Sequence, residues 1–183
     1  SSLQDGKVFQ IAVSAEKDPI AHQTLLLRAF YRLLKNKRPE KLDDYYKFCN
    51  GETKAPFSSL TEDLWIQAKE EALCIEIGNI DDNKTLDKAI NNALKDRENN
   101  KPWILIGGPP CQAYSLVGRA RNKGKIDYRP EEDHRHFLYR EYLRIIQQYQ
   151  PDIFVMENVK GILSSTINGK KIFLQFVSDG CMP

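Results

Sequence analysis

Two short apolar runs, each followed at once by a chemically distinctive segment, constrain the fold of this chain most strongly. Residues 103–106 lead directly into glycines and prolines, and residues 153–156 lead directly into Glu157. Both runs are apolar enough to form buried strands of a parallel sheet. Two further β-rich runs, at residues 8–13 and 72–77, come earlier in the chain. The sequence therefore predicts a sheet whose strands are separated by long stretches of chain.

Helical patterns fill the stretches between these runs. Residues 19–37 carry apolar side chains at helical spacing, and Asp18 followed by Pro19 is a typical helix start. Further helices are expected over residues 61–71, 85–97 and 133–149. Alternating strands and helices predict a doubly wound α/β fold with right-handed crossovers. In such sheets ligands bind beyond the carboxyl ends of the strands, which is where Cys111 and Glu157 fall.

The composition fits one globular domain. Of the 183 residues, 41% are hydrophobic, which is enough for a core. Residues 38–59 mix charged residues, glycine and prolines with aromatics, so we expect a loop-rich insertion there rather than a second domain. With 27 basic and 25 acidic residues, the net charge of +2 is close to balance. Any nucleic-acid binding must therefore rest on local features.

The cysteines and the hydropathy bound the cellular setting. The four cysteines are scattered without a Cys-x-x-Cys pair, which predicts neither a disulfide framework nor a zinc knuckle. His134 and His136 have the spacing of a metal-binding pair, but no other ligands accompany them, so we expect no metal. No apolar run approaches the ~20 residues of a membrane span, and no signal peptide opens the chain. We expect a cytoplasmic protein without a membrane partner.

Cys111 is the cysteine whose position favours chemistry. A cysteine nucleophile reacts as a thiolate and needs a polar, accessible position, whereas Cys74 lies inside an apolar run that is typical of core packing. Cys111 follows a predicted strand within Gly-Gly-Pro-Pro-Cys-Gln-Ala-Tyr-Ser at residues 107–115. The glycines and prolines make this segment a stiff turn that can hold a side chain in a cleft.

Residues 107–115 resemble the nucleophile motif of the cytosine-C5 DNA methyltransferase family, in which Pro-Cys-Gln precedes a small residue, an aromatic and Ser. Met-Glu-Asn-Val at residues 156–159 resembles the family's Glu-Asn-Val segment, which holds the target cytosine by its Watson–Crick edge. Residues 133–139 resemble the Asp-x-Arg-x-x-Leu-aromatic segment that lies between the two. The resemblance implies a Rossmann-like core that uses S-adenosylmethionine as the methyl donor.

For these residues the resemblance implies the mechanism of a DNA (cytosine-5-)-methyltransferase. Cys111 would add to C6 of a cytosine flipped out of double-stranded DNA and make C5 nucleophilic. Glu157 would protonate N3, or share a proton with it, and accept from the exocyclic amine, and Asn158 would shape the pocket. Methyl transfer from the sulfonium to C5, loss of the C5 proton and expulsion of Cys111 would complete the reaction.

A basic, glycine-punctuated stretch at residues 118–125 follows the nucleophile motif. Loops of this kind both move and contact phosphates, and the resemblance implies a catalytic loop that closes on DNA. A solvated surface loop is the alternative interpretation. The residues expected to contact DNA are Gln112, Ser115, Arg119, Arg121 and Lys123.

The cofactor residues are expected at the ends of the earlier strands. Glu16 is placed where a carboxylate takes ribose hydroxyls in nucleotide-binding α/β folds. Residues 12–19 resemble the family's second motif, although Lys17 stands where an adenine-packing aromatic is common. Residues 78–80 resemble Gly-Asp-Ile, with an asparagine whose amide oxygen can replace the acid that accepts from the adenine amino group. The residues expected to contact S-adenosylmethionine are Glu16, Asn79, Ile80, Pro110 and Leu138.

Parts of the family pattern are missing from these 183 residues. The glycine-rich first motif does not precede residue 8, and the chain stops before the Gln-x-Arg-x-Arg segment and the target-recognition region. We therefore expect a partial catalytic domain, incomplete at both ends, that binds S-adenosylmethionine weakly by itself. Missing N- and C-terminal segments or a second subunit would complete it.

Two alternatives stay open at this point. A transfer-RNA-modifying branch of the family keeps both motifs, so RNA cytosine is an alternative substrate. A methyltransferase-like subunit that binds DNA without chemistry is the other. A bacterial or phage restriction-modification setting fits the family, whereas the DNA target sequence cannot be read from these residues.

Overall fold

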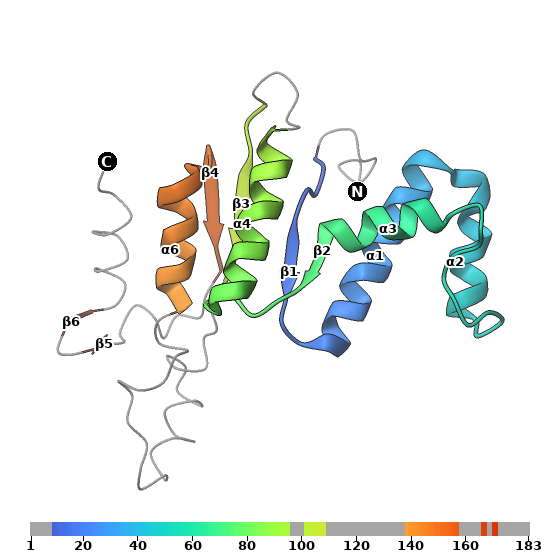
Figure 1. Ribbon diagram of the computed structural model, residues 1–183, viewed down its shortest axis with the longest axis horizontal. Helices are drawn as coiled ribbons and strands as arrows, with labels where there is room; N and C mark the ends of the chain where they lie inside the picture. Colours follow the sequence, from blue (N-terminus) through green and yellow to red (C-terminus); the bar gives the residue numbers. More distant parts are fainter. Residues whose placement is uncertain (1–8, 96–100, 109–137, 158–165, 168–169, 172–183) are drawn as a thin grey trace, which may run out of the picture. The chain divides into compact units, whose positions relative to one another are not determined.

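The computed structural model describes residues 9–95, 101–108, 138–157, 166–167 and 170–171. The chain divides into two compact units, residues 1–97 and 98–183. Each unit contributes one pair of parallel strands together with helices, so the chain is an α/β protein (Figure 1). Within the described ranges the two pairs are separate sheets, and the doubly wound sheet stays a prediction.

In the first unit, strand β1 (Ser14–Glu16) pairs in parallel with β2 (Ala72–Cys74), with Ser14 opposite Ala72 and Glu16 opposite Cys74. The strand predicted at 8–13 is wrong for the described residues 9–13, which precede β1. Strand formation requires a partner, and the short β2 reaches only residues 14–16. The prediction for residues 72–77 is confirmed over its first half.

Helix α1 (Pro19–Lys37) has the predicted bounds, because its start signal is local. The Asp18 side chain accepts hydrogen bonds from the backbone N–H groups of Ile20 and Ala21 at 2.8 and 2.9 Å. One face of α1 packs against helix α3 (Glu62–Glu71), which lies beside it in Figure 1. The core that they share consists of Leu26, Ala29, Phe30, Leu34, Leu64, Ala68 and Ala72.

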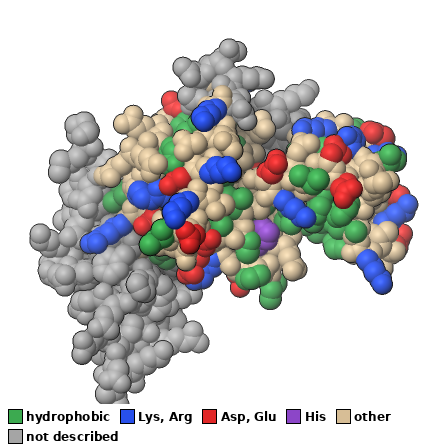
Figure 2. Space-filling model, viewed as in Figure 1, with side chains coloured by type: hydrophobic (Ala, Val, Ile, Leu, Met, Phe, Trp, Pro, Cys, Tyr) green, Lys and Arg blue, Asp and Glu red, His purple; other side chains and the backbone are tan. Residues whose placement is uncertain are grey.

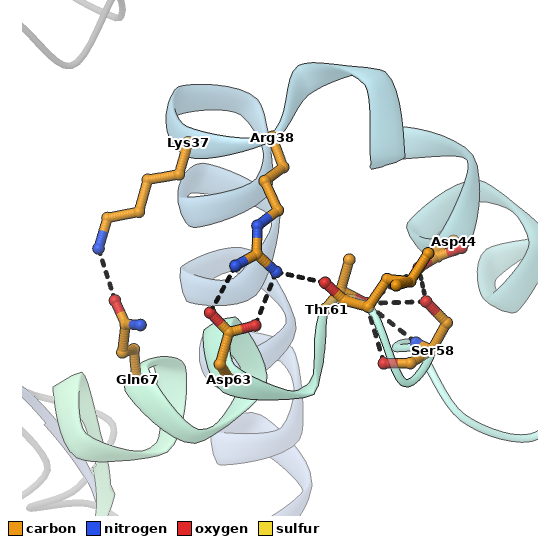
Figure 3. Close-up of polar contacts among 8 residues, drawn as sticks. Lys37, Arg38, Asp44, Ser58, Thr61, Asp63 and Gln67 are labelled. Atoms are coloured by element: carbon orange, nitrogen blue, oxygen red, sulfur yellow. Dashed lines mark hydrogen bonds and ion pairs between the residues drawn. The ribbon is translucent and has the colours of Figure 1, made fainter.

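Residues 38–59, expected to be loop-rich, also contain a 3-10 turn, η2 (Pro39–Lys41), and helix α2 (Leu42–Cys49). This helix is favoured because Tyr45 and Leu42 pack against the core of α1 and α3. A polar network fixes the return to α3: the Asp44 carboxylate accepts from the hydroxyls of Ser58 and Thr61 at 2.6 and 2.9 Å (Figure 3). The insertion is therefore built onto the first unit.

Two further expectations for the first unit need correction. Helix α4 (Ile80–Lys95) begins at Ile80 rather than Thr85, because the Asn79 side-chain oxygen accepts from the backbone N–H groups of Asp81 and Asp82 at 3.0 and 3.2 Å. Cys74, expected in the core, is exposed. It is the last residue of β2, where the short strand pair ends.

In the second unit, β3 (Ile104–Gly107) and β4 (Ile153–Met156) pair in parallel, with Ile104 opposite Ile153 and Gly107 opposite Met156. Both predicted strands are confirmed. Helix α6 (Leu138–Tyr149) lies between them in the sequence, and the first residues of its predicted range, 133–137, lie outside the described residues. A short antiparallel pair, β5 (Thr166–Ile167) and β6 (Lys170–Lys171), follows.

The expected burial of β3 and β4 is wrong: Phe154 is 43% exposed and Leu105 only half-buried on the face toward α6, and the other face is more open. Ile104, Ile106, Ile153 and Val155 are all exposed, with Ile106 at 72%. In a strand, alternate side chains share a face, so these four side chains stand on the side opposite to Leu105 and Phe154. Helix α6 packs on the latter side, where the Tyr142 ring lies 6.5 Å from the Phe154 ring.

Candidate active site

The ends of β3 and β4 bring two predicted motifs together. The backbone N–H of Glu157 donates to the carbonyl of Gly107 at 3.0 Å, which extends the strand pairing to the first residue after β4. Parallel strands end at the same edge of a sheet, so the segment that leads to Cys111 and the segment that begins with Glu157 leave from neighbouring positions.

Gly108 and Glu157 approach more closely than a side chain on Gly108 would permit. An ideal Cβ at position 108 would lie 2.5 Å from the Glu157 carbonyl oxygen and 3.2 Å from its Oε2 atom. The Glu157 carboxylate therefore lies beside Gly108, and Glu157 is itself exposed. An exposed carboxylate at this edge can accept hydrogen bonds from a ligand or share a proton with it.

Tyr142 of helix α6 contacts the backbone of both strands near this edge. Its side chain is 8% exposed, and its hydroxyl lies 2.8 Å from the carbonyl oxygen of Val155 and 3.3 Å from that of Leu105. Burial raises the pKa of the Tyr142 hydroxyl to about 12, so it remains a hydrogen-bond donor at alkaline pH as well as at neutral pH. Sequence reasoning missed this residue. The available signal was an aromatic side chain with a polar tip beside Leu143 on the apolar face of the helix.

The predicted cofactor residues of the first unit follow the ends of β1 and β2. Glu16 Oε1 accepts from the backbone N–H of Asp18 at 2.9 Å. Lys17 and Glu76, from the two turns, form an ion pair at 2.6 Å, so the structure brings these turns together. Because both turns follow parallel strands, they lie at one edge of this strand pair.

Asn79 and Ile80 offer different groups to a ligand. The Asn79 side-chain oxygen already caps α4, so its amide nitrogen is the group left to donate to a ligand. Ile80 is 75% exposed and offers an apolar surface. Gly78 has a φ of +99°, a conformation that side chains rarely adopt, and its N–H donates to Asn83 at 3.0 Å.

Most of the other predicted site residues lie outside the described residues: Cys111, Asn158, Pro110, Gln112, Ser115, Arg119, Arg121 and Lys123. Leu138 is the first residue of α6. The possible metal pair, His134 and His136, is also outside the described part of the chain. Within that part, no group of three or more potential metal ligands is found.

The surface charge of the described residues is mixed. On the face drawn in Figure 2, Lys and Arg side chains lie among Asp and Glu side chains, in keeping with the near-balanced composition. No helix in the described ranges is both long enough and apolar enough to span a membrane.

Comparisons with known proteins agree with the motifs. The chain is 34% identical to the type II methyltransferase M.Bpa9945I of Bacillus paralicheniformis over 170 residues, which cover 86% of this chain and 37% of that protein. It is 38% identical to M.FnuDI of Fusobacterium nucleatum over 53% of this chain and 26% of that protein. It is 41% identical to M.BspRI of Lysinibacillus sphaericus over 42% of this chain and 15% of that protein.

The chain thus spans well under half the length of these relatives. No solved structure matches it. The model of the family described as C-5 cytosine-specific DNA methylase matches residues 67–179, a range that includes Cys111 and Glu157 but not Glu16. This range is more than half of the chain, and the resemblance seen in the motifs is confirmed: the chain belongs to the C-5 cytosine-specific DNA methylase family.

Proposed function

We propose that this chain forms the part of a DNA (cytosine-5-)-methyltransferase that carries the nucleophile, Cys111, and the carboxylate that assists it, Glu157. The contact between Gly108 and Glu157 is the observation that supports this most directly. Cys111 follows Gly108 by three residues, and three residues of extended chain span only about 11 Å. Cys111 therefore lies no more than about 11 Å from Gly108, a span that would allow one base to reach both the thiol and the carboxylate.

In the proposed reaction, the Cys111 thiolate adds to C6 of a flipped cytosine. Glu157 hydrogen-bonds N3, accepts from the exocyclic amine and draws the added negative charge away from the ring. Asn158 shapes the pocket around the base. S-adenosylmethionine, when bound, supplies the methyl group that C5 accepts. Removal of the C5 proton then restores the ring and releases Cys111 as a thiolate.

The described residues of the first unit fit part of a pocket for S-adenosylmethionine. A carboxylate can accept several hydrogen bonds, so the bond from Asp18 leaves Glu16 able to hold ribose hydroxyls. The exposed Ile80 offers an apolar surface to adenine, and the Asn79 amide nitrogen can donate to a ring nitrogen. We propose that these residues contribute to a Rossmann-like cofactor site that further parts of the protein complete.

Double-stranded DNA is the proposed substrate. The family description names DNA, and the relatives are named type II methyltransferases. We propose that Gln112, Ser115 and the basic residues of 118–125 contact the DNA around the flipped base, in the cytoplasm of a bacterial or phage host with a restriction-modification system. Segments outside these residues, or a second subunit, would read the target sequence.

Covalent trapping tests the proposed mechanism. Full-length protein is incubated with duplex DNA that contains 5-fluorocytosine and with S-adenosylmethionine, and adducts that survive denaturation are counted. Wild type and Cys74→Ser should both form the adduct, whereas Cys111→Ser should form none. The exposed Cys74 makes a matched control for loss of a thiol. An adduct with Cys111→Ser, or none with wild type on DNA of varied sequence, would overturn the proposal.

The substrate is tested separately. Transfer of labelled methyl groups is compared on duplex DNA and on transfer RNA with the same full-length protein. Label in DNA is the expected result. Label confined to RNA would favour the transfer-RNA branch, and binding of DNA without any transfer would favour the non-catalytic alternative.

A further inference from the structure

The hydroxyl of Tyr142 lies at the junction between the two strands whose ends carry the candidate site. It is 2.8 Å from the carbonyl oxygen of Val155 in β4 and 3.3 Å from that of Leu105 in β3. Leu105 lies two residues before Gly107, the last residue of β3, and Val155 lies two residues before Glu157, the first residue after β4. One side chain thus contacts both strands, at positions one residue apart in register, near their carboxyl ends.

The ring of Tyr142 also contacts both strands. A Cβ on Gly107 would lie 3.1 Å from a ring carbon of Tyr142, so the ring lies directly under the last residue of β3. The edge of the ring also faces Phe154 of β4, with the ring centres 6.5 Å apart and the planes at 73°. Displacement of Tyr142 would therefore be transmitted to both strand ends.

The buried hydroxyl of Tyr142 makes a hydrogen bond to the strand that an apolar side chain could not make. Leu143 and Ile145 on the same helix are buried without a polar group, so the packing of α6 does not by itself require a hydroxyl. Like any tyrosine hydroxyl, that of Tyr142 is protonated at neutral pH and can donate to the Val155 carbonyl. The bond joins the helix to the strand residue that leads, through Met156, to Glu157.

We propose that Tyr142 is a positioning residue for methyl transfer: its hydroxyl fixes the end of β4 against β3 and thereby sets the Glu157 carboxylate beside Gly108, from which the chain continues to Cys111. The inference rests on the proposed function, because it assigns Glu157 the role of assisting the base. Tyr142 acts through other groups: its hydroxyl contacts the backbone carbonyls of Leu105 and Val155, and its ring packs against Phe154.

The test removes the hydroxyl and keeps the ring. In the full-length protein, the rate constant of adduct formation with 5-fluorocytosine duplex DNA is measured at saturating DNA and S-adenosylmethionine for wild type and Tyr142→Phe. Small displacements of reacting groups cost up to about 100-fold in rate, so we expect Tyr142→Phe to slow the step roughly 10-fold. The dissociation constants for DNA and for S-adenosylmethionine should change less than about 2-fold.

Tyr149→Phe is the matched control, because it makes the same chemical change on the same helix. The Tyr149 hydroxyl accepts from the neighbouring Gln148 side chain at 3.0 Å, at the other end of α6. Its adduct rate should equal that of wild type. Equal rates for Tyr142→Phe and Tyr149→Phe would overturn the inference.

A double-mutant comparison separates positioning from general support. If Tyr142 acts through Glu157, its substitution should matter little once the carboxylate is gone, so Tyr142→Phe should slow Glu157→Ala by less than about 2-fold. Independent, multiplicative losses would show that the hydroxyl acts on the fold and not on Glu157. An absence of any adduct with wild type would instead contradict the proposed function, so the two failures are distinguishable.

Discussion

The backbone carbonyl oxygen of Glu157 lies 2.5 Å from the point where a Cβ on Gly108 would stand. Real Cβ atoms do not approach an oxygen this closely, so glycine at position 108 is a condition for this arrangement of the strand ends. The same closeness places Glu157 Oε2 3.2 Å from that point. The glycine in front of Pro109-Pro110-Cys111 thus has a physical task that is separate from turn flexibility.

Gly108→Ala should therefore damage both stability and chemistry. The added methyl group must push the Glu157 backbone away, which we expect to cost about 1–3 kcal/mol of unfolding free energy, as overpacking does. The displaced carboxylate should slow adduct formation on 5-fluorocytosine DNA at least ~10-fold. Urea denaturation and covalent trapping measure the two effects.

Gly51→Ala is the control for this substitution. Gly51 has a φ of +77° and no atoms within 4 Å of its ideal Cβ, so alanine there is strained without a clash. It should lose about 1 kcal/mol of stability and keep the wild-type adduct rate. A wild-type adduct rate for Gly108→Ala as well would show that the close approach does not matter to the chemistry.

The titration of Tyr142 predicts a specific alkaline effect. Burial raises its pKa from 10.0 to about 12. The folded state therefore binds this proton more tightly than the unfolded state, and the resulting stability is fully present below pH 10 and is lost as the pH rises toward 12. Wild type should lose more stability than Tyr142→Phe between these pH values. Parallel stability curves above pH 10, measured by urea denaturation, would contradict this.

Sequence patterns predicted those parts of the fold whose causes are local. The start of α1 follows from its own residues, because Asp18 caps the first turn and Pro19 fits the first helical position. Strand β4 is a continuous apolar run and was predicted at its observed bounds. Strand β1 was misplaced because its extent is set by pairing with β2, far along the chain.

The candidate site also has parts that the sequence could predict and parts that depend on long-range packing. The strand ends that carry Gly107 and Glu157 could be located from the two motifs. The contact between Gly108 and Glu157, and the place of Tyr142 beneath them, depend on the packing of α6 against β3 and β4. Sequence spacing does not encode that packing. Asn79 shows a third case, since a residue expected to contact a ligand also caps a helix.

Asn79 offers a prediction that separates its two tasks. Its side-chain oxygen accepts from the backbone N–H groups of Asp81 and Asp82. Asn79→Ala should cost about 1 kcal/mol of unfolding free energy, whereas Asn79→Asp keeps a capping oxygen and should stay within roughly 0.5 kcal/mol of wild type. Urea denaturation measures both variants. Equal loss in both would mean that the cap adds little.

The proposed cofactor contact of Asn79 predicts a different pattern for S-adenosylmethionine. With its oxygen used by α4, Asn79 is left with its amide nitrogen to offer a ligand, and aspartate lacks that donor. Calorimetric titration of the full-length protein should therefore show weaker binding by Asn79→Asp, by about 10-fold, despite its intact cap. Tighter binding would indicate that the side chain turns to accept from adenine.

The buried hydroxyl of Thr61 carries the last prediction, on the anchoring of the insertion at 38–59. Thr61 is fully buried, and its Oγ1 donates to Asp44 Oδ2 at 2.9 Å and accepts from the backbone N–H of Ser58 at 2.9 Å (Figure 3). Thr61→Val leaves both partners without this contact, so we expect a loss of about 2 kcal/mol. Thr53→Val, which removes an exposed hydroxyl that donates to Ala55, should cost well under 1 kcal/mol.

The same network predicts an acid dependence. Burial would raise the pKa of Asp44, but the hydrogen bonds from Ser58 and Thr61, with Lys41 and Lys47 nearby, outweigh it and hold the pKa below 3.8. Stability from the ionised carboxylate is therefore present above this pH and is lost as the pH falls through the lowered pKa. Thr61→Val should lose less stability than wild type on acidification, as measured by urea denaturation. An unchanged acid dependence would show that the Asp44 pKa does not depend on Thr61. At neutral pH, the rate of adduct formation by Thr61→Val should equal that of wild type, because the network lies in the unit without Cys111 and Glu157.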